Sequence, residues 1–401
     1  MKKKRIVVTG LGVVTSIGIG KDAFWDNLIK GKSGISKVES FDTSNQFTHL
    51  GGEIKNFKPE VFLNKKKVKL MARASHLAIA AAKLALRDSN LDLKGVDKRL
   101  AICVGTTGGE SQEIEEMDAV WVKKGHENVD KWSVAQYPVN NISSNLAIEL
   151  KSNGINRIFT TACAAGNYAI GYGYDLLQLD KADIVLAGGS DAFSYLSFTG
   201  FNQVGAVAPE KCQPFDKNRK GMMVGEGAGM LILETLENAT KRKAPIYAEI
   251  LGYGLSCDAH HMTNPQVEGI ADCMRNALKE AGILSNDVDY INAHGTGTKH
   301  NDRTECAAIK QVFNGQNVPV SSIKSMLGHT MGAASAIETI VCCLTVKNDI
   351  IPPTINYQTP DPECDIDCVP NVAKRQKVNI VLKNAFAFGG NNSSLVIKKY
   401  S

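Results

Sequence analysis

The segment Arg157-Ile158-Phe159-Thr160-Thr161-Ala162-Cys163-Ala164-Ala165-Gly166 places a cysteine between a strand-like run and a helix-like run. β-Branched and aromatic residues precede the cysteine, and apolar residues recur at helical spacing from Tyr168 to Leu179. A cysteine at such a junction lies at a helix N-terminus, where unpaired backbone N–H groups and the helix dipole favour a thiolate. The segment therefore predicts a nucleophile or, alternatively, a structural cysteine, since free cysteine is among the most buried residue types.

Strand-like and helix-like runs alternate along the 401-residue chain, which predicts an α/β architecture. A composition dip from Glu237 to Pro245 predicts a division into residues 1–243 and 244–401. The junctions at Phe159–Cys163 and Tyr290–His294 are alike, which suggests a duplicated unit. Strands are expected at residues 5–9, 100–105, 156–161, 183–188, 228–234, 246–254, 288–293, 318–322 and 378–387, and helices at 21–30, 70–90, 139–152, 164–179, 265–281, 303–313 and 331–348.

The composition is that of an ordinary globular protein, with 43% hydrophobic and 22% charged residues. A net charge of +5 does not call for a nucleic-acid partner. The ten cysteines form no CxxC pair, so their spacing predicts neither a metal site nor a disulfide framework. No apolar run approaches the ~20 residues of a membrane span. We therefore expect a cytoplasmic protein with no membrane association.

Three later segments combine glycine with polar residues at expected strand ends. Each has an ordinary explanation when it is taken alone. A single histidine is more often a hydrogen-bonded core or surface residue than a catalyst, and Gly389-Gly390 fits a simple turn. The three segments are Asn292-Ala293-His294-Gly295-Thr296-Gly297-Thr298, Ser322-Ile323-Lys324-Ser325-Met326-Leu327-Gly328-His329 and Ala385-Phe386-Ala387-Phe388-Gly389-Gly390-Asn391-Asn392.

Together with Cys163, these segments resemble the elongating, Cys-His-His type of β-ketoacyl-acyl-carrier-protein synthase in the thiolase superfamily. The resemblance runs almost from end to end. It implies a thiolase-like α/β fold, with duplicated βαβαβαββ halves in a five-layer α-β-α-β-α arrangement. Further matches are Val8-Thr9-Gly10-Leu11-Gly12, Leu186-Ala187-Gly188-Gly189-Ser190, Pro214-Phe215-Asp216, Gly225-Glu226-Gly227-Ala228-Gly229 and Pro352-Pro353-Thr354-Ile355-Asn356.

The resemblance implies a decarboxylative condensation. Cys163 would hold an acyl chain as a thioester. The neutral imidazoles of His294 and His329 would donate to the enolate oxygen that forms when a malonyl thioester loses carbon dioxide. Lys324 and its acidic partner Glu338 would give electrostatic support, because a buried ammonium needs such a partner.

The resemblance also implies a gate in front of the acyl pocket. Phe388 and Phe201 match the gating phenylalanines, and the backbone N–H groups of Cys163 and Phe388 would form the oxyanion hole. Gly389 and Gly390 would let the loop swing. The family has glycine where this chain has Ala387, and the added Cβ restricts the backbone there.

The substrates would arrive on the phosphopantetheine arm of an acyl carrier protein, without a separate cofactor or metal. Thr296, Thr298 and Thr263 match positions that bind this arm. The basic run of Lys65, Lys66, Lys67 and Lys69 matches the docking site of the acidic carrier protein, although such a run is also typical of a solvated helix end.

Related activities fit less well. A thiolase needs a second cysteine within residues 385–394, and this segment has none. A non-elongating partner subunit lacks the nucleophile that Cys163 supplies. The segments 205–216 and 105–110 are similar to polyketide-type enzymes, which favours a type II polyketide or polyene pathway over primary fatty-acid elongation. Either a homodimer or a heterodimer with a homologous ketosynthase-like subunit fits this interpretation.

Overall fold

A computed structural model describes residues 3–95 and 99–401. Its strands are β1 (Ile6–Thr15), β2 (Gly18–Ile19), β3 (Ser36–Lys37), β4 (Leu50–Gly51), β5 (Leu100–Gly105), β6 (Asn156–Phe159), β7 (Ile184–Asp191), β8 (Gly227–Thr235), β9 (Ala248–Cys257), β10 (Tyr290–Asn292), β11 (Val320–Ser321), β12 (Ile350–Ile351), β13 (Lys374–Arg375), β14 (Ile380–Phe386) and β15 (Asn391–Lys399). Its helices are α1 (Lys21–Ile29), α2 (Lys65–Val68), α3 (Arg73–Asp88), α4 (Ser111–Lys124), α5 (Lys131–Gln136), α6 (Asn141–Leu150), α7 (Ala165–Gln178), α8 (Tyr195–Gln203), α9 (Leu236–Lys241), α10 (Val267–Ala281), α11 (Lys299–Val312), α12 (Lys324–Leu327) and α13 (Ala334–Asn348).

The main sheet contains the same five-strand pattern twice. In the first pattern the order across the sheet is β1-β8-β7-β5-β6, and in the second it is β9-β15-β14-β10-β11. In each pattern the first two pairings are antiparallel and the last two are parallel. The patterns join where Ile6–Val8 of β1 pairs with Ala248–Ile250 of β9. The two halves of the sheet therefore have the same strand order and the same pattern of pairing.

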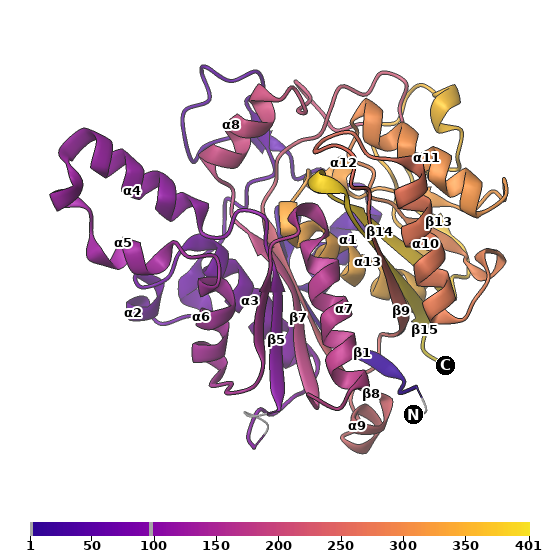
Figure 1. Ribbon diagram of the computed structural model, residues 1–401, viewed down its shortest axis with the longest axis horizontal. Helices are drawn as coiled ribbons and strands as arrows, with labels where there is room; N and C mark the ends of the chain where they lie inside the picture. The colour runs from indigo at the N-terminus through magenta and orange to yellow at the C-terminus, as the bar shows by residue number, and fades with distance from the viewer. Residues whose placement is uncertain (1–2, 96–98) are drawn as a thin grey trace.

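Helices cover both faces of each half of the sheet (Figure 1). Helix α3 packs on the outer face of β1 and β8, and α10 packs on the outer face of β9 and β15. Helices α7 and α13 lie between the two halves and contact strands of both. The order is therefore helix, sheet, helix, sheet, helix. The five-layer arrangement expected from the sequence is confirmed.

Strand β1 is longer than expected because its glycines are strand residues that face a helix. At Gly12 a Cβ would lie 1.8 Å from the Ala81 carbonyl oxygen, and at Gly10 it would lie 2.3 Å from the Ala85 carbonyl oxygen. These glycines let α3 approach the strand backbone, as glycine does at close contacts. Residues 10–15 therefore continue the strand instead of forming the expected loop.

Strand β15 was not expected, because Asn391-Asn392-Ser393-Ser394 is too polar to be typical of a strand. It nonetheless pairs with β14 on one side and β9 on the other, and residues 392–394 are buried. The Ser394 hydroxyl donates to the Asn384 side-chain oxygen at 2.8 Å, which satisfies both groups inside the sheet.

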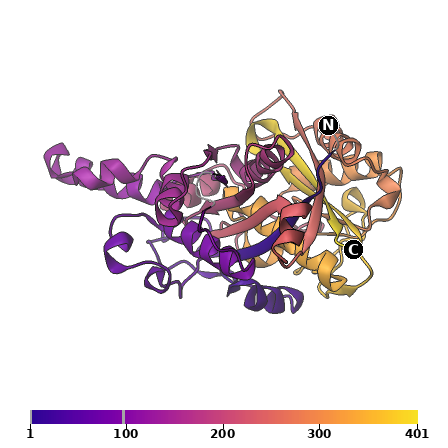
Figure 2. The same ribbon diagram turned by 90° about the horizontal axis from the view of Figure 1, so that it is seen from below.

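Helices α4 and α5 were also not expected, and they extend away from the layered body (Figures 1 and 2). They carry large apolar side chains that are exposed, including Trp121 and Trp132. Among the described residues, every helix is too short or too polar to cross a membrane.

Candidate active site

Cys163 lies in a short 3₁₀ turn, Ala162–Ala164, between β6 and α7. Ala162 has φ of 46°, a left-handed conformation that turns the chain sharply before the helix. Gly166 lets α7 begin directly against α13, because a Cβ there would lie 2.8 Å from the Ala336 backbone nitrogen. This packing leaves Cys163 only 8% exposed, at the wall of a cavity.

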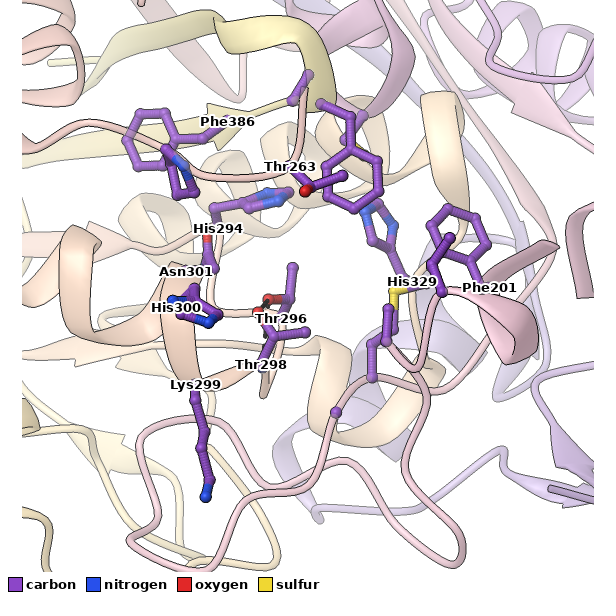
Figure 3. Close-up of a pocket in the computed structure, with 18 of the residues that line it drawn as sticks. Phe201, Thr263, His294, Thr296, Thr298, Lys299, His300, Asn301, His329 and Phe386 are labelled. Atoms are coloured by element: carbon purple, nitrogen blue, oxygen red, sulfur yellow. Dashed lines mark hydrogen bonds between the residues drawn. The ribbon is translucent and has the colours of Figure 1, made fainter. Parts of the chain in front are cut away.

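Both predicted histidines lie beside this thiol. The Cys163 sulfur and one ring nitrogen from each of His294 and His329 all lie within 4.8 Å of one another. The imidazole centroids are 5.5 Å apart and the ring planes differ by 79°, so the rings meet edge to face (Figure 3). The cavity of about 460 Å³ is lined by all three residues.

Backbone contacts fix the proton position on one ring. The Met331 N–H donates to Nδ1 of His329 at 3.1 Å, so the neutral ring carries its proton on Nε2. That Nε2 is buried and has no hydrogen-bond partner among the described residues, and the same holds for Nδ1 of His294. His329 is therefore a hydrogen-bond donor toward the cavity.

The protonation states differ in part from the sequence-based expectation. Burial raises the pKa of Cys163 to about 11, although the charge of Lys324 acts in the opposite direction. In the unliganded site, loss of water raises the pKa of the thiol more than the helix N-terminus lowers it, so the thiol is the resting form. Burial and nearby lysines hold the pKa values of His294 and His329 well below their usual range, so both rings are neutral.

Lys324 and Glu338 form the expected buried ion pair behind the histidines. A third charged residue, Lys383 of β14, completes the cluster with its Nζ 3.0 Å from Oε2 of Glu338. All three side chains are at most 2% exposed. Lys383 lies outside the segments that the sequence predicted to form the active site. Its pairing with Glu338 depends on the packing of β14 against α13.

The thiol and two imidazoles are also a set of donors that could hold a metal ion. A metal would need the lone pair of His329 Nε2, but the Met331 N–H already uses the Nδ1 lone pair and leaves the proton on Nε2. Lys324 and Lys383 add positive charge behind the rings. The arrangement therefore fits donation to a developing oxyanion better than it fits coordination of a cation.

The predicted gate and arm-binding residues line the same cavity. The rings of Phe201 and Phe388 are 6.0 Å apart and inclined by 46°. Phe388 begins a turn in which Gly389 and Gly390 have φ of 83° and 76°, values that glycine adopts without strain. Figure 3 shows how Thr263, Thr296 and Thr298 lie around the cavity, and the Thr296 and Thr298 hydroxyls are 2.9 Å apart.

Two buried carboxylates position the loops of the site, and sequence reasoning missed both. Glu305 accepts the backbone N–H groups of His294 and Gly295, each at 2.8 Å, and burial raises the pKa of Glu305 to about 7. Asp191 accepts the Gly332 N–H at 2.7 Å and also groups of residues 106–108, and burial raises its pKa to about 6. Acidic residues in helix α11 and at the end of β7 are the only sequence signals for them.

The basic run is on a different part of the surface. Residues Lys65–Val68 form the short helix α2, and none of Lys65, Lys66, Lys67 and Lys69 lines the cavity. Lys67 pairs with Glu149 at 2.5 Å, whereas Lys65, Lys66 and Lys69 are exposed.

Residues 3–239 match the β-ketoacyl synthase N-terminal domain and residues 247–358 match the β-ketoacyl synthase C-terminal domain. The chain belongs to the β-ketoacyl synthase family. This membership accounts for the thiolase-like layers.

Relatives in the β-ketoacyl synthase family match over the full length. The chain is 39% identical to 3-oxoacyl-[acyl-carrier-protein] synthase 2 of Synechocystis sp., covering 100% of this chain and 99% of the relative. It is also 39% identical to nodulation protein E of Rhizobium sp., covering 99% of each chain. Its structure is similar to that of the ishigamide ketosynthase/chain length factor, with a TM-score of 0.97, 43% identity and complete coverage of both chains.

Proposed function

We propose that this protein is a β-ketoacyl-acyl-carrier-protein synthase that joins an acyl group held on Cys163 to a malonyl unit carried by an acyl carrier protein, with loss of carbon dioxide. Each cycle extends the chain by two carbons. The observation that carries the proposal is the meeting of one thiol and two neutral imidazoles at the wall of one cavity.

The first half-reaction is transfer of the acyl group. The Cys163 thiol is protonated when the site is unliganded, so its proton must leave as the sulfur attacks the incoming thioester carbonyl. Among the described residues, no protein group contacts Nδ1 of His294, so no contact fixes which nitrogen of this ring carries its proton. The ring can therefore accept the thiol proton and pass it to the departing pantetheine thiol. Backbone N–H groups of Cys163 and Phe388 stabilise the oxyanion.

The second half-reaction is decarboxylation and condensation. Cleavage of the malonyl C–C bond releases carbon dioxide and places negative charge on the thioester oxygen, where Nε2–H of His329 and a ring N–H of His294 donate hydrogen bonds. The enolate carbon then attacks the acyl thioester on Cys163. The new C–C bond forms, the C–S bond to Cys163 breaks, and the thiolate takes up a proton.

The partners follow from the same proposal. The phosphopantetheine arm passes Thr263, Thr296 and Thr298 and the gate of Phe201 and Phe388, and it brings both substrates without a separate cofactor. The acidic carrier protein docks on the exposed lysines of α2, which attract it electrostatically. A homologous ketosynthase-like chain, identical or different, forms the dimer.

We further propose a type II polyketide or polyene pathway, with primary fatty-acid elongation by the same chemistry as the alternative. The similarity to a ketosynthase solved in complex with a type II PKS acyl-carrier protein, with a TM-score of 0.92 and 33% identity over both full chains, supports this choice. The division into residues 1–243 and 244–401 is likewise a proposal, supported by the repeated strand order on either side of it.

We also propose that the protein works in the cytoplasm. All ten cysteines are free, which suits this reducing compartment.

Replacement of the nucleophile tests the function. With acyl- and malonyl-loaded carrier proteins, the wild-type protein should gain an acyl adduct in intact-protein mass spectrometry and should form the β-ketoacyl product. Cys163→Ala should form neither. Cys257→Ala is the matched control, because Cys257 is exposed and does not line the cavity. Normal condensation by the Cys163→Ala protein would show that the nucleophile is assigned wrongly.

A second experiment distinguishes the two pathways. The protein is given acyl groups of increasing chain length, and the product attached to the carrier protein is identified by mass spectrometry.

A further inference from the structure

Lys383 is a buried lysine that the proposed reaction does not use. Its side chain is completely buried in β14, three residues before Phe386, whose ring lies edge to face with His294 at 6.0 Å. A buried ammonium is expensive unless an anion compensates it. The one ion-pair partner of Lys383 in the described part of the chain is Glu338, and that carboxylate also pairs with Lys324.

The charges of this cluster do not cancel. Glu338 contributes one negative charge, and Lys324 and Lys383 contribute one positive charge each, so the cluster has a net charge of +1 behind two uncharged imidazoles. In the water-poor interior, such a charge disfavours the imidazolium form of a neighbouring histidine. A protonated histidine pair would be a different catalyst, because the expected role of the rings is to donate N–H groups while they remain neutral.

The groups that face this cluster come from several elements. Lys383 pairs with Glu338 on α13, and the charges of Lys324 on α12 and of Cys342 on α13 also act on its ammonium. The charge of Lys383 acts in turn on the two histidines, and Glu305 of α11 holds the His294 loop. Burial and Lys324 lower the pKa of Lys383, whereas Glu338 raises it. Lys324 and Lys383 both lower the pKa values of His294 and His329.

We propose that Lys383 is a positioning residue for the condensation: it shares Glu338 with Lys324 and its charge keeps His294 and His329 neutral at acidic pH. The inference rests on the proposed function, because it concerns the step in which the two rings stabilise the enolate. Lys383 does not line the cavity, so it acts through Glu338 and through its field. The alternative is that Lys383 has only a structural role and fills space between β14 and α13.

The test is the pH dependence of malonyl-carrier decarboxylation by the purified full-length protein, followed as release of carbon dioxide. Lys383→Met removes the charge and keeps an unbranched side chain that is one atom shorter, and Lys383→Gln removes the charge but keeps a polar end group. Lys383→Arg keeps the charge. Lys399→Met is the control for loss of a lysine from the adjacent strand, since Lys399 lies on β15 and pairs with Asp349 at 2.6 Å.

Without the Lys383 charge, the histidines should take up protons more readily. The acidic limb of the profile should therefore move to higher pH by about half a unit or more in Lys383→Met and Lys383→Gln. The rate on the plateau and the KM for the malonyl carrier should stay within about twofold of wild type, because neither donor is lost. Lys383→Arg and Lys399→Met should keep the wild-type limb.

An unshifted limb in folded Lys383→Met or Lys383→Gln would overturn the proposal. So would failure of both neutral variants to fold while Lys383→Arg folds, since Lys383 would then be a structural cation. Failure of the wild-type protein to release carbon dioxide would instead count against the proposed function. The two inferences therefore fail in different measurements.

Discussion

Ala387 shows how one methyl group can affect access to the nucleophile. It lies between Phe386, which packs on His294, and Phe388, which we propose as a gate residue. Its backbone is extended, with φ of −117° and ψ of 153°, so alanine fits this conformation without strain. The loop is held by Ala387 N–H to the Asn391 carbonyl at 3.1 Å and Gly389 N–H to the Met262 carbonyl at 2.9 Å. The proposed gate would open by a change of backbone angles in this loop, and the Cβ of Ala387 limits which angles are accessible.

Ala387→Gly should therefore open the gate more often. Glycine gains roughly 0.5–1 kcal/mol of backbone freedom, which corresponds to an open population about two- to fivefold larger. We expect a similar rise in the rate at which iodoacetamide alkylates Cys163, measured on the peptide that contains it by mass spectrometry. Ala135→Gly, the same change at an exposed position in α5, should leave that rate unchanged. Equal rates for Ala387→Gly and wild type would mean that Ala387 does not limit the gate.

The contact between β1 and α3 is the tightest packing on the outer face of the first half-sheet. Glycines on the strand meet a helix face made mostly of buried alanines, so the two backbones approach closely. Neither partner has a side chain that could move aside. The alanines of this face are Ala74, Ala78, Ala81, Ala82 and Ala85.

Gly12→Ala should be strongly destabilising, because its Cβ would lie 1.8 Å from the Ala81 carbonyl oxygen. We expect a loss of about 3 kcal/mol or more in the free energy of unfolding, since the backbone of α3 must shift. Gly200→Ala in α8 is the matched control, because nothing lies within 4 Å of its added Cβ. That change should raise stability by up to about 1 kcal/mol through helix propensity. Urea unfolding of both variants gives the comparison, and a Gly12→Ala protein as stable as wild type would contradict it.

At the scale of the whole molecule, the extended pair α4 and α5 is the part of the structure that the layers leave uncovered (Figure 1). Trp121 and Trp132 are 57% and 56% exposed, and Val122 is 85% exposed. Large apolar residues grouped on a projecting element are typical of a surface that another chain covers. Residues 106–108, which donate hydrogen bonds to Asp191, lie just before the start of α4.

We expect the protein to be a dimer that uses this surface. Analytical ultracentrifugation should give twice the 43.2 kDa of the chain, and the double change Trp121→Glu with Trp132→Glu should give the monomer mass. Leu284→Glu is the control, because Leu284 is 73% exposed but lies after α10. A double variant that remained dimeric would show that the dimer forms elsewhere.

The local sequence was sufficient to find the thiol and the two imidazoles that meet at the cavity. Cys163, His294 and His329 each follow a strand-like run within a short segment of small or polar residues, and the structure brings all three to one cavity. Three supporting groups could not be found in this way. Asp191 accepts from the Gly332 N–H, 141 residues further along the chain, and Lys383 pairs with Glu338 of another element. Glu305 accepts from the backbone of a loop that lies 10 and 11 residues before it in the chain, so its role depends on how that loop folds back. Strand β15 was missed because it begins with a polar run, and only pairing with β14 and β9 shows that these residues belong to the sheet.

The sequence by itself determined the α/β architecture, the junction that carries Cys163 and the residue types of the reaction. Those features depend on short-range patterns of apolar, small and polar residues. The tertiary structure alone decided the protonation states. It buries the thiol, which raises the pKa of Cys163 to about 11, and it supplies two lysines whose charges, together with burial, hold the pKa values of both histidines well below their usual range. The physical reason is that a pKa depends on the water and the charges around a group, and both are set by segments far apart in the chain.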